Sequence, residues 1–345
     1  MTEIRFPFLS LPIDLGVKVM KTMSLHEQTA YSLASKKSYS KIKSLRLPIP
    51  KVLIRIHGEL FGFMEISLAA KDITDGEISF KLQSQRSDGM ITSLDDIPVN
   101  LEVSKTLFSP FGHKLFDLSN QGMCFGEWIQ HICSIFQGKH YGAEFTIGMS
   151  QLNIQSLRNI LPELRSVQLK CSRSGRNQQG VLYAQSILKA FLPDVENVSL
   201  FSVPLHESLS VQHIGLTNLK MLRIYGNRKL KLDDLISLNV KNFRIDTDQT
   251  TLRDLNRFFK LWMKGSNPKL KKLSIYLRNG NNSDWSVLLN GFQTEESEDA
   301  QVKNVTIQNC FGVSARIQIR VGGTYVIVEL TVSNYKTKLW FLNLI

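Results

Sequence analysis

The sequence contains few cysteines and no long apolar run, and each absence excludes a class of protein. Its four cysteines lie far apart: Cys124, Cys133, Cys171 and Cys310. None belongs to a Cys-x-x-Cys pair or has a histidine at zinc-ligand spacing, so we expect no metal site and reduced, mostly buried thiols. Reduced thiols favour the cytoplasm or the nucleus. No apolar run approaches the roughly 18 residues of a membrane span, and the first residues lack the apolar core of a signal peptide, so we expect no membrane association.

Sequence signatures of catalysis are also missing. The chain has no Gly-x-Ser-x-Gly, His-Glu-x-x-His or Gly-x-Gly-x-x-Gly segment, the short motifs of hydrolases, metalloproteases and dinucleotide-binding enzymes. Gly138-Lys139 lacks the upstream glycine and the following Ser or Thr of a phosphate-binding loop. Adjacent carboxylates such as Asp233-Asp234 point apart, which makes them poor acid–base pairs. We therefore expect a non-catalytic protein without a cofactor.

The composition is that of a folded, basic protein. The chain has 345 residues, of which 43% are hydrophobic and 21% charged, values that are typical of globular domains rather than disordered segments. Its length is sufficient for two domains. The net charge of +12 favours acidic partners or nucleic acid. However, the positive charges are scattered without a block of more than two, so we interpret them as solvated faces and do not expect nucleic-acid binding.

Three short helices are predicted near the start of the chain. An amphipathic segment covers Ile13 to Met23. Ser24 and Glu27 have the spacing of a capping box, so a second helix should begin there and continue to about residue 35. A third, basic helix is predicted over Lys36 to Leu45. Three short helices bury little apolar surface by themselves, so they either cover the next domain or bind a partner.

This segment resembles an F-box over roughly residues 6 to 46. The resemblance rests on Leu11-Pro12 near the start, on apolar positions of the first helix, and on Leu33-Ala34-Ser35-Lys36 at the end of the second. The whole chain is similar to the expanded nematode F-box families, in which an F-box precedes an F-box-associated (type 2) domain. The resemblance implies a substrate-recognition subunit of an SCF-type cullin-RING ubiquitin ligase, with the F-box bound to the Skp adaptor.

The resemblance also implies which side chains contact the Skp adaptor: Leu11, Pro12, Leu15, Val19, Leu25, Leu33, Ser35 and Lys36. A structural alternative stays open, because Leu15, Val19 and Leu33 could pack the three helices together. Gly16 lies inside the first predicted helix, where glycine costs roughly 1 kcal/mol relative to alanine. A close approach by the partner would explain a glycine there.

Strands are predicted from Val52 to about Lys105. Apolar and polar residues alternate in this region, as in strands with one buried face. The links Thr74–Gly76 and Ser87–Gly89 contain Asp-Gly, which suits tight turns between antiparallel strands. An amphipathic helix is predicted over Phe125–Phe136, because its apolar residues recur at spacings of three and four.

A short phrase then recurs along the second half of the chain. It consists of an apolar residue, two polar residues and an apolar–polar–apolar strand, first as Leu161–Leu169 and then as Leu192–Leu200. Further copies lie at Leu216–Ile224, Leu238–Ile245, Asn267–Ile275 and Val302–Ile307. Repeats at irregular intervals of about 20 to 30 residues are typical of leucine-rich-repeat-like solenoids, in which stacked strand–helix units share one core.

We therefore expect a mixed α+β or α/β chain. The predicted domains are a three-helix F-box (residues 1–48) and an F-box-associated substrate-binding domain (residues 49–345). The second would consist of a strand-rich part (49–120), leucine-rich-repeat-like repeats in an irregular βα solenoid (121–310) and a closing C-terminal hairpin (311–345). The segment from Leu252 to Ile275 resembles the signature of the nematode F-box-associated domain.

The strand face of the repeats is the predicted site for a target protein. Its polar positions include Gln168, Lys170, Arg223 and Arg244. Lysine and arginine on neighbouring strands would suit an acidic or phosphorylated ligand, because guanidinium groups pair with carboxylate or phosphate. These side chains could equally keep the strand face soluble.

These observations leave three hypotheses for function. The first is the ligase adaptor, which binds the Skp adaptor at one end and an unknown protein substrate at the other. The second is a basic nucleic-acid-binding or innate-immune sensor protein, and the third is a repeat scaffold with a relic F-box.

Overall fold

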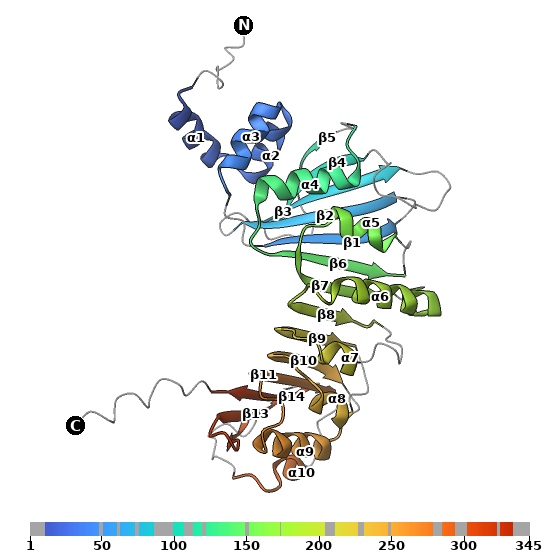
Figure 1. Cartoon of the computed structure of the whole chain (residues 1–345), viewed down its shortest axis with the longest axis vertical. Coiled ribbons are helices and arrows are strands. Elements are labelled where there is room, and N and C mark those ends of the chain that lie inside the picture. Colours follow the sequence, from blue (N-terminus) through green and yellow to red (C-terminus); the bar gives the residue numbers. More distant parts are fainter. Residues whose placement is uncertain are drawn as a thin grey trace, which may run out of the picture. The chain divides into compact units, whose positions relative to one another are not determined.

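The computed structural model (Figure 1) describes residues 11–47, 51–60, 63–72, 76–85, 99–106, 113–118, 122–148, 152–172, 174–203, 211–226, 231–247, 250–278, 285–293, 302–322 and 325–333. The chain divides into two compact units, Met1–Ser166 and Val167–Ile345. Both units combine helices with strands, which confirms the predicted mixed fold class at that level. The predicted link Ser87–Gly89 and the first residues of the F-box match, 6–10, lie outside the described residues, as does Thr74–Gly76 except for Gly76.

The three N-terminal helices form where the sequence predicts them. They are α1 (Ile13–Thr22), α2 (Leu25–Leu33) and α3 (Lys36–Ser44). At the start of α2 the Ser24 N–H donates to the Glu27 carboxylate over 2.8 Å, the reciprocal bond of the expected capping box. At the start of α3 the Ser35 hydroxyl accepts from the Ser38 N–H over 3.0 Å.

The sheet of the first unit contains six strands in the order β6-β1-β2-β3-β4-β5. They are β1 (Val52–Leu60), β2 (Phe63–Asp72), β3 (Gly76–Gln85), β4 (Asn100–Thr106), β5 (His113–Leu118) and β6 (Tyr141–Ile147). Strands β1 to β5 pair antiparallel, as predicted for the region from Val52 to Lys105. Strand β6 pairs parallel with β1.

Helix α4 (Phe125–Phe136) has the predicted bounds and supplies the core of the first unit. Trp128 and Phe136 are fully buried, and the Phe136 ring lies 5.4 Å from that of Phe80 on β3. The short helix α5 (Ile154–Ile160) follows β6. Full burial of an aromatic side chain contributes about 1.5–3 kcal/mol, so α4 is held to the sheet chiefly by its apolar stripe.

Helices α2 and α3 are attached to α4 by polar contacts. The Ser32 hydroxyl lies 2.8 Å from His131 Nε2, and the Tyr39 hydroxyl lies 2.7 Å from the Ser134 hydroxyl. The Tyr39 and His131 rings stack with their centroids 5.0 Å apart. The inner side of α2 and α3 is therefore covered by this chain itself.

The second unit contains strands in the order β7-β8-β9-β10-β11-β14-β13-β12, with the unit boundary inside β7. Their bounds are β7 (Leu164–Cys171), β8 (Asn197–Phe201), β9 (Met221–Tyr225), β10 (Asn242–Thr247), β11 (Lys272–Arg278), β12 (Val302–Gln308), β13 (Ser314–Gly322) and β14 (Tyr325–Val332). Strands β8 to β11 pair parallel, and β11, β14, β13 and β12 pair antiparallel. The helices between them are α6 (Gln178–Phe191), α7 (Val211–Gly215), α8 (Leu232–Ile236), α9 (Leu252–Met263) and α10 (Trp285–Leu289).

The repeated phrase marks neighbouring strands in five of its six copies. The first five copies end in β7 to β11, which lie in that order in the sheet. The sixth copy was predicted to continue this series, and that prediction is wrong. Its strand β12 pairs antiparallel with β13, while β14 occupies the place beside β11. The links between β12, β13 and β14 are short, and short links join only antiparallel neighbours. The solenoid assignment of residues 121–310 stays a prediction.

The strand pairing of the predicted C-terminal hairpin is confirmed, while residues 323–324 and 334–345 of its predicted range lie outside the described residues. Strands β13 and β14 pair antiparallel, from Ala315 opposite Val332 to Gly322 opposite Tyr325. Through β14, this hairpin continues the sheet beyond the parallel strands.

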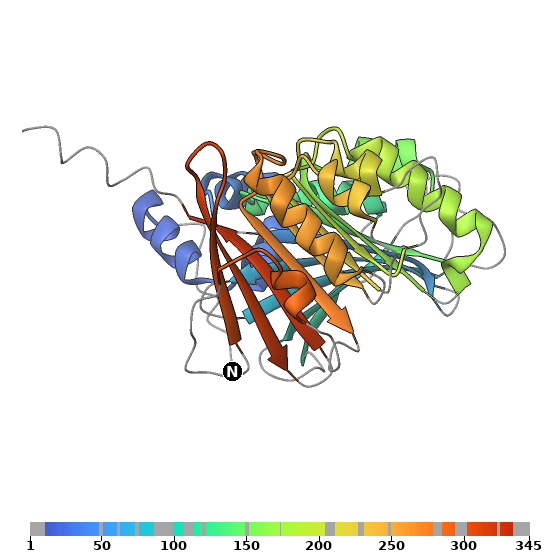
Figure 2. The ribbon, with the colours of Figure 1, turned by 90° about the horizontal axis from the view of Figure 1, so that it is seen from below.

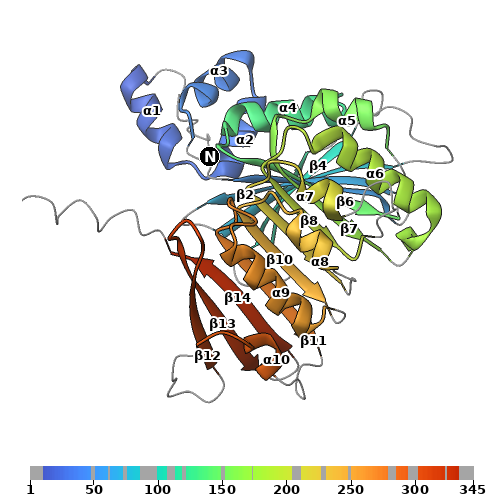
Figure 3. The same cartoon turned by 60° about the horizontal axis from the view of Figure 1, so that its bottom comes forward.

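Side chains alternate between two different faces of the parallel strands. Phe243 and Ile245 of β10 are 1% or less exposed, as are Leu273 and Ile275 of β11. Helices α7, α8 and α9 lie along one face of β8 to β11 (Figure 3), and Figure 2 shows α9 in orange across the same strands. Trp262 and four other side chains of α9 are buried. The opposite face carries partly exposed polar and aromatic side chains.

None of the four cysteines, all of which the structure describes, forms a disulfide. Cys124 and Cys133 are buried, and burial raises the pKa of the Cys133 thiol to about 12. Cys310 is exposed, in contrast to the expectation that the thiols are mostly buried. Within the part of the chain that the structure describes, no helix has the length and apolarity to cross a membrane.

The His131 contact predicts a pH-dependent stability of the first unit. Burial lowers the pKa of His131 below its ordinary value of 6.5. The unfolded chain then takes up a proton first on acidification, so the free energy of unfolding falls below about pH 6.5. We expect a small loss between pH 7.5 and 5.5, because solvent reaches this partly exposed ring and weakens the effect. His131→Gln should flatten this part of the dependence, as measured by thermal unfolding. An equal pH dependence in both proteins would contradict the assignment.

Candidate partner-binding surfaces

Helix α1 exposes an apolar ridge. Leu15 and Val19 lie one helical turn apart with exposed fractions of 44% and 39%, and Ile13 before them is 83% exposed. The neighbouring ridge, Gly16 and Met20, is buried. We call Leu15 and Val19, which are four residues apart and so share one side of the helix, the α1 ridge. Scattered apolar side chains are common at protein surfaces, but these two lie side by side on one short helix.

Gly16 is not required by packing within the chain. A Cβ atom built at Gly16 would meet no heavy atom within 4 Å, and its backbone is that of an ordinary helix. The space beside the α1 ridge is therefore open among the described residues. A close approach by a partner remains one physical reason for a glycine there.

The other predicted F-box residues divide between the surface and the interior. Pro12 and Lys36 are exposed, while Leu11 and Leu33 are half-buried. Ser35 caps α3. Leu25 is only 5% exposed, so it packs within this chain. Helix α1 is joined to α2 by the Gln28 side-chain amide, which donates to the Met20 carbonyl over 2.9 Å.

The predicted target-binding residues all lie in the second unit, on the sheet face away from the helices. Arg223 and Arg244 are directly opposite each other on β9 and β10, and both are half-buried. Gln168 and Lys170 lie on β7, and the Lys170 ammonium lies 5.8 Å from the centre of the Phe201 ring on β8. The structure therefore places all four residues on neighbouring strands.

Aromatic rings fill the spaces between these cations. The Phe201 and Tyr225 rings stack with centroids 4.6 Å apart and an interplanar angle of 8°. The Arg244 guanidinium carbon lies 5.4 Å from the Tyr225 ring and 4.2 Å from the Tyr276 ring. Lysine, phenylalanine, tyrosine, arginine and tyrosine thus follow one another across β7 to β11. Each such cation–π contact contributes about 0.5–2 kcal/mol.

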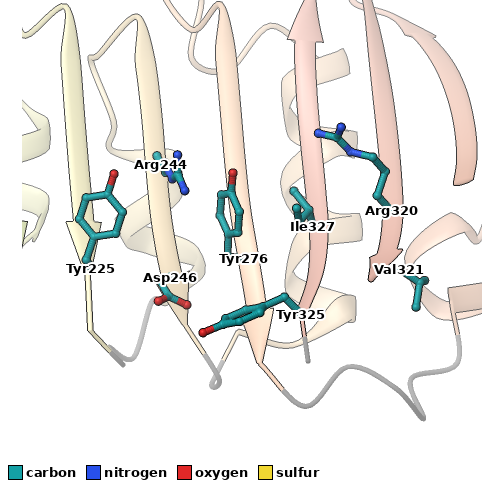
Figure 4. Close-up of a pocket in the computed structure, with 8 residues that line it drawn as sticks. All are labelled: Tyr225, Arg244, Asp246, Tyr276, Arg320, Val321, Tyr325 and Ile327. Carbon is teal, nitrogen blue, oxygen red and sulfur yellow. The ribbon is translucent and has the colours of Figure 1, made fainter. Parts of the chain in front are cut away.

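A cavity of about 460 Å³ opens at the end of this series. Its lining comes from five strands, β9, β10, β11, β14 and β13 (Figure 4): Tyr225, Arg244, Asp246, Tyr276, Arg320, Val321, Tyr325 and Ile327. Sequence reasoning identified only Arg244 among these eight. Alternation along β9 to β11 could have indicated Tyr225, Asp246 and Tyr276. No sequence signal indicated Arg320 or Tyr325, because the place of β13 and β14 in the sheet was not predicted.

The two arginines of the cavity differ in their partners. Arg320 forms an ion pair with Glu329, which also accepts from the Ser274 hydroxyl over 2.9 Å and lies 3.1 Å from the Lys272 ammonium. Arg244 forms no hydrogen bond or ion pair with any described residue, and its buried Nε atom has no acceptor. Arg244 is therefore the cation that is open to an anionic ligand.

The Glu329 carboxylate is ionised well below neutral pH. Partial burial raises the pKa of Glu329, but the Ser274 hydrogen bond and the charges of Lys272 and Arg320 outweigh it, so the pKa lies below the ordinary value of 4.5. The carboxylate fixes Arg320 and Lys272 at the edge of the cavity. Over the described ranges, no group of three or more His, Cys, Asp or Glu side chains could hold a metal ion. The arrangement is suited to binding an anion.

Comparison with known proteins matches part of this face to a family model. Residues 210–275 match the family model described as F-box associated. This segment contains β9, β10 and α9, and it includes Arg223, Tyr225 and Arg244. The chain is also similar to the F-box associated domain-containing protein sdz-33 of Caenorhabditis elegans, with 23% identity over 288 residues that cover 81% of this chain and 80% of that protein. No solved structure gives a significant match.

The matches confirm the F-box-associated part of the predicted resemblance. They bear out the segment from Leu252 to Ile275, which lies within residues 210–275. They do not test the predicted N-terminal F-box, which stays a prediction.

The Glu329 contacts predict a measurable contribution to stability. Glu329→Gln keeps the shape of the side chain but removes the charge that pairs with Lys272 and Arg320. Because both cations are about half exposed, we expect a loss of about 1 kcal/mol at pH 7. The lowered pKa means that the wild-type contribution disappears as the pH falls through 4.5 and below. In denaturant titrations, the two proteins should therefore differ more in their free energy of unfolding at pH 7 than at pH 3.5. A constant difference at both values would contradict this assignment.

Proposed function

We propose that this chain is a non-catalytic adaptor subunit of an SCF-type cullin-RING ubiquitin ligase, active in the cytoplasm or the nucleus. In this proposal the α1 ridge and its surroundings bind the Skp adaptor. The sheet face of the second unit binds the target protein. The F-box-associated match of residues 210–275 and the similarity to a protein named for that domain support this general role.

The α1 ridge is the observation that carries the proposal. Water-exposed leucine and valine side chains gain about 25 cal/mol for each Å² that a partner covers. Helices α2 and α3 cannot provide that cover, because their inner sides already face α4 through Tyr39 and His131. The ridge is thus the apolar part of the N-terminal helices that a second polypeptide could bury.

The proposed activity requires no catalytic group on this chain. A bound target is held near the ubiquitin-charged enzyme of the ligase, which raises the effective concentration of its lysines. Adaptor and target bind to different units of the chain, so each binding event can be tested separately.

The nucleic-acid alternative is less well supported by the sheet face. Base stacking needs aromatic rings with free faces. The Phe201 and Tyr225 rings face each other, and the Arg244 guanidinium lies against Tyr225 and Tyr276. The side of Phe201 toward Tyr225, both sides of Tyr225 and the side of Tyr276 toward Arg244 are therefore occupied by groups of this chain.

Substitution of the ridge tests the adaptor proposal. Leu15→Asp with Val19→Asp puts two charges where the Skp adaptor should bury apolar surface, so co-purification with the adaptor should fall at least tenfold, or about 1.4 kcal/mol. Leu11→Ala with Pro12→Ala should also weaken it. Both ridge side chains are exposed, so the thermal midpoint should change little.

A matched control uses an exposed leucine of the second unit. Leu182 on α6 is 54% exposed, and Leu182→Asp should leave co-purification unchanged. Wild-type recovery of the Skp adaptor by the Leu15→Asp, Val19→Asp protein would refute the proposed binding surface.

A further inference from the structure

We propose that the cavity between β9 and β13 binds the phosphorylated tyrosine side chain of a target protein. This inference rests on the proposed target-binding function of the sheet face and specifies its ligand. Four observations carry it: the state of Arg244, the charge around the cavity, the placement of its polar groups, and the nature of its walls.

Arg244 lies between two aromatic rings and pairs with no described carboxylate. Its guanidinium carbon lies 5.4 Å from the centre of the Tyr225 ring and 4.2 Å from that of the Tyr276 ring, so the two rings limit its position. Its Nε atom is buried without an acceptor. A buried donor without an acceptor costs about 1–3 kcal/mol, a cost that an anionic ligand in the cavity would offset. A guanidinium fixed in this way is ready to form a forked pair with an oxyanion.

The charges around the cavity favour a dianion over a single carboxylate. The charged side chains that line the cavity are Arg244, Arg320 and Asp246, and Arg223 lies directly opposite Arg244 on β9. These three cations and one carboxylate leave a surplus of two positive charges, and the nearby Glu329 is shared between Arg320 and Lys272. A phosphate monoester carries −1.5 to −2 at pH 7, whereas a carboxylate carries one charge.

The polar groups gather at one end of the cavity. Figure 4 shows the guanidinium groups of Arg244 and Arg320 and the hydroxyl groups of Tyr225 and Tyr276 toward the same end of the strands, with Asp246 and Tyr325 toward the other end. A phosphate has three acceptor oxygens, so it can use donors from several of these side chains. The Asp246 carboxylate lies away from this position.

The remaining walls suit an aromatic stem. Ile327, Val321 and the Tyr276 and Tyr325 rings supply apolar surface below the polar end. The volume of about 460 Å³ lies toward the lower end of the range for small-ligand sites, about 300–1,000 Å³. It is sufficient for one large side chain. A phosphotyrosine joins an oxyanion to an aromatic ring, whereas phosphoserine is too short to occupy the apolar part.

Binding to purified full-length protein tests the inference. The probes are phenyl phosphate and one alanine-rich peptide in four versions, with phosphotyrosine, tyrosine, phosphoserine or glutamate at its centre. We expect binding of phenyl phosphate and of the phosphotyrosine peptide, with at least tenfold weaker binding of the other three peptides and of inorganic phosphate.

Variants assign the binding to the cavity. Arg244→Gln should lower affinity for the phosphotyrosine peptide at least tenfold. Arg257 is exposed on α9, on the helix side of the unit, and Arg257→Gln removes the same charge, so its affinity should stay within twofold of wild type. If Arg244→Gln does not fold, wild-type protein still decides the question. Phenyl phosphate should then shift the NMR signals of Tyr225, Tyr276 and Tyr325, and unchanged signals would overturn the inference.

Other outcomes reject the inference in distinct ways. Equal binding of the phosphoserine or glutamate peptide would reject an aromatic phosphate site. Tighter binding of a single-stranded oligonucleotide, lost in Arg244→Gln, would assign the face to nucleic acid and also overturn it. No ligase component is present in these measurements. Absence of phosphotyrosine binding would therefore not contradict the proposed binding of the Skp adaptor. Likewise, a failed pull-down of the Skp adaptor would not contradict phosphotyrosine binding.

Discussion

The alternation of side chains along β8 to β11 is the constraint on which the second unit depends. Phe243 and Ile245 alternate with Arg244, and Leu222 and Ile224 alternate with Arg223. The apolar set is buried on the helix side at about 1% exposure or less, and each side chain contributes about 1.5–3 kcal/mol. A shift of one residue would exchange the two faces, so burial of one set fixes the outward direction of the other.

The outward set is therefore free to carry function. Side chains on this face contribute little to the apolar core, yet the parallel register brings residues from distant parts of the sequence into one row. Tyr225, Arg244 and Tyr276 come from three strands and meet at 4.2 to 5.4 Å. Strand β14 then brings Ile327 and Tyr325 alongside. In our proposal this row is the target-binding site, and its central cation is held ready by rings rather than by a carboxylate.

The N-terminal helices divide two roles between them. Helices α2 and α3 use Ser32, Tyr39 and neighbouring residues to contact α4, which makes them part of the first unit. Helix α1 presents Leu15 and Val19 outward. The hypothesis that these helices leave an apolar surface for a partner therefore applies to α1, while much of the surface of α2 and α3 is already covered by this chain.

The sequence alone predicted where individual helices and strands lie better than which strands lie side by side. Periodicity located α4 to the residue, and the repeated phrase located β7 to β11, because both patterns follow from one buried face. The same phrase at Val302–Ile307 does form a strand, but the pattern did not indicate its position in the sheet. The length of the connections, rather than composition, decides which strands pair. For that reason Arg320 and Tyr325 could not be assigned to the site. Leu25 illustrates a second limit of the sequence. Its position in the motif indicated contact with a partner, but its side chain is buried within this chain.

Hydrogen exchange of the purified chain, with and without purified Skp adaptor, tests the central claim most directly. The account predicts that the adaptor slows exchange of the backbone amides of α1, Ile13–Thr22, and leaves those of β9 to β11 unchanged. Formation of a complex with no protection in α1, or with protection confined to β9 to β11, would contradict the account.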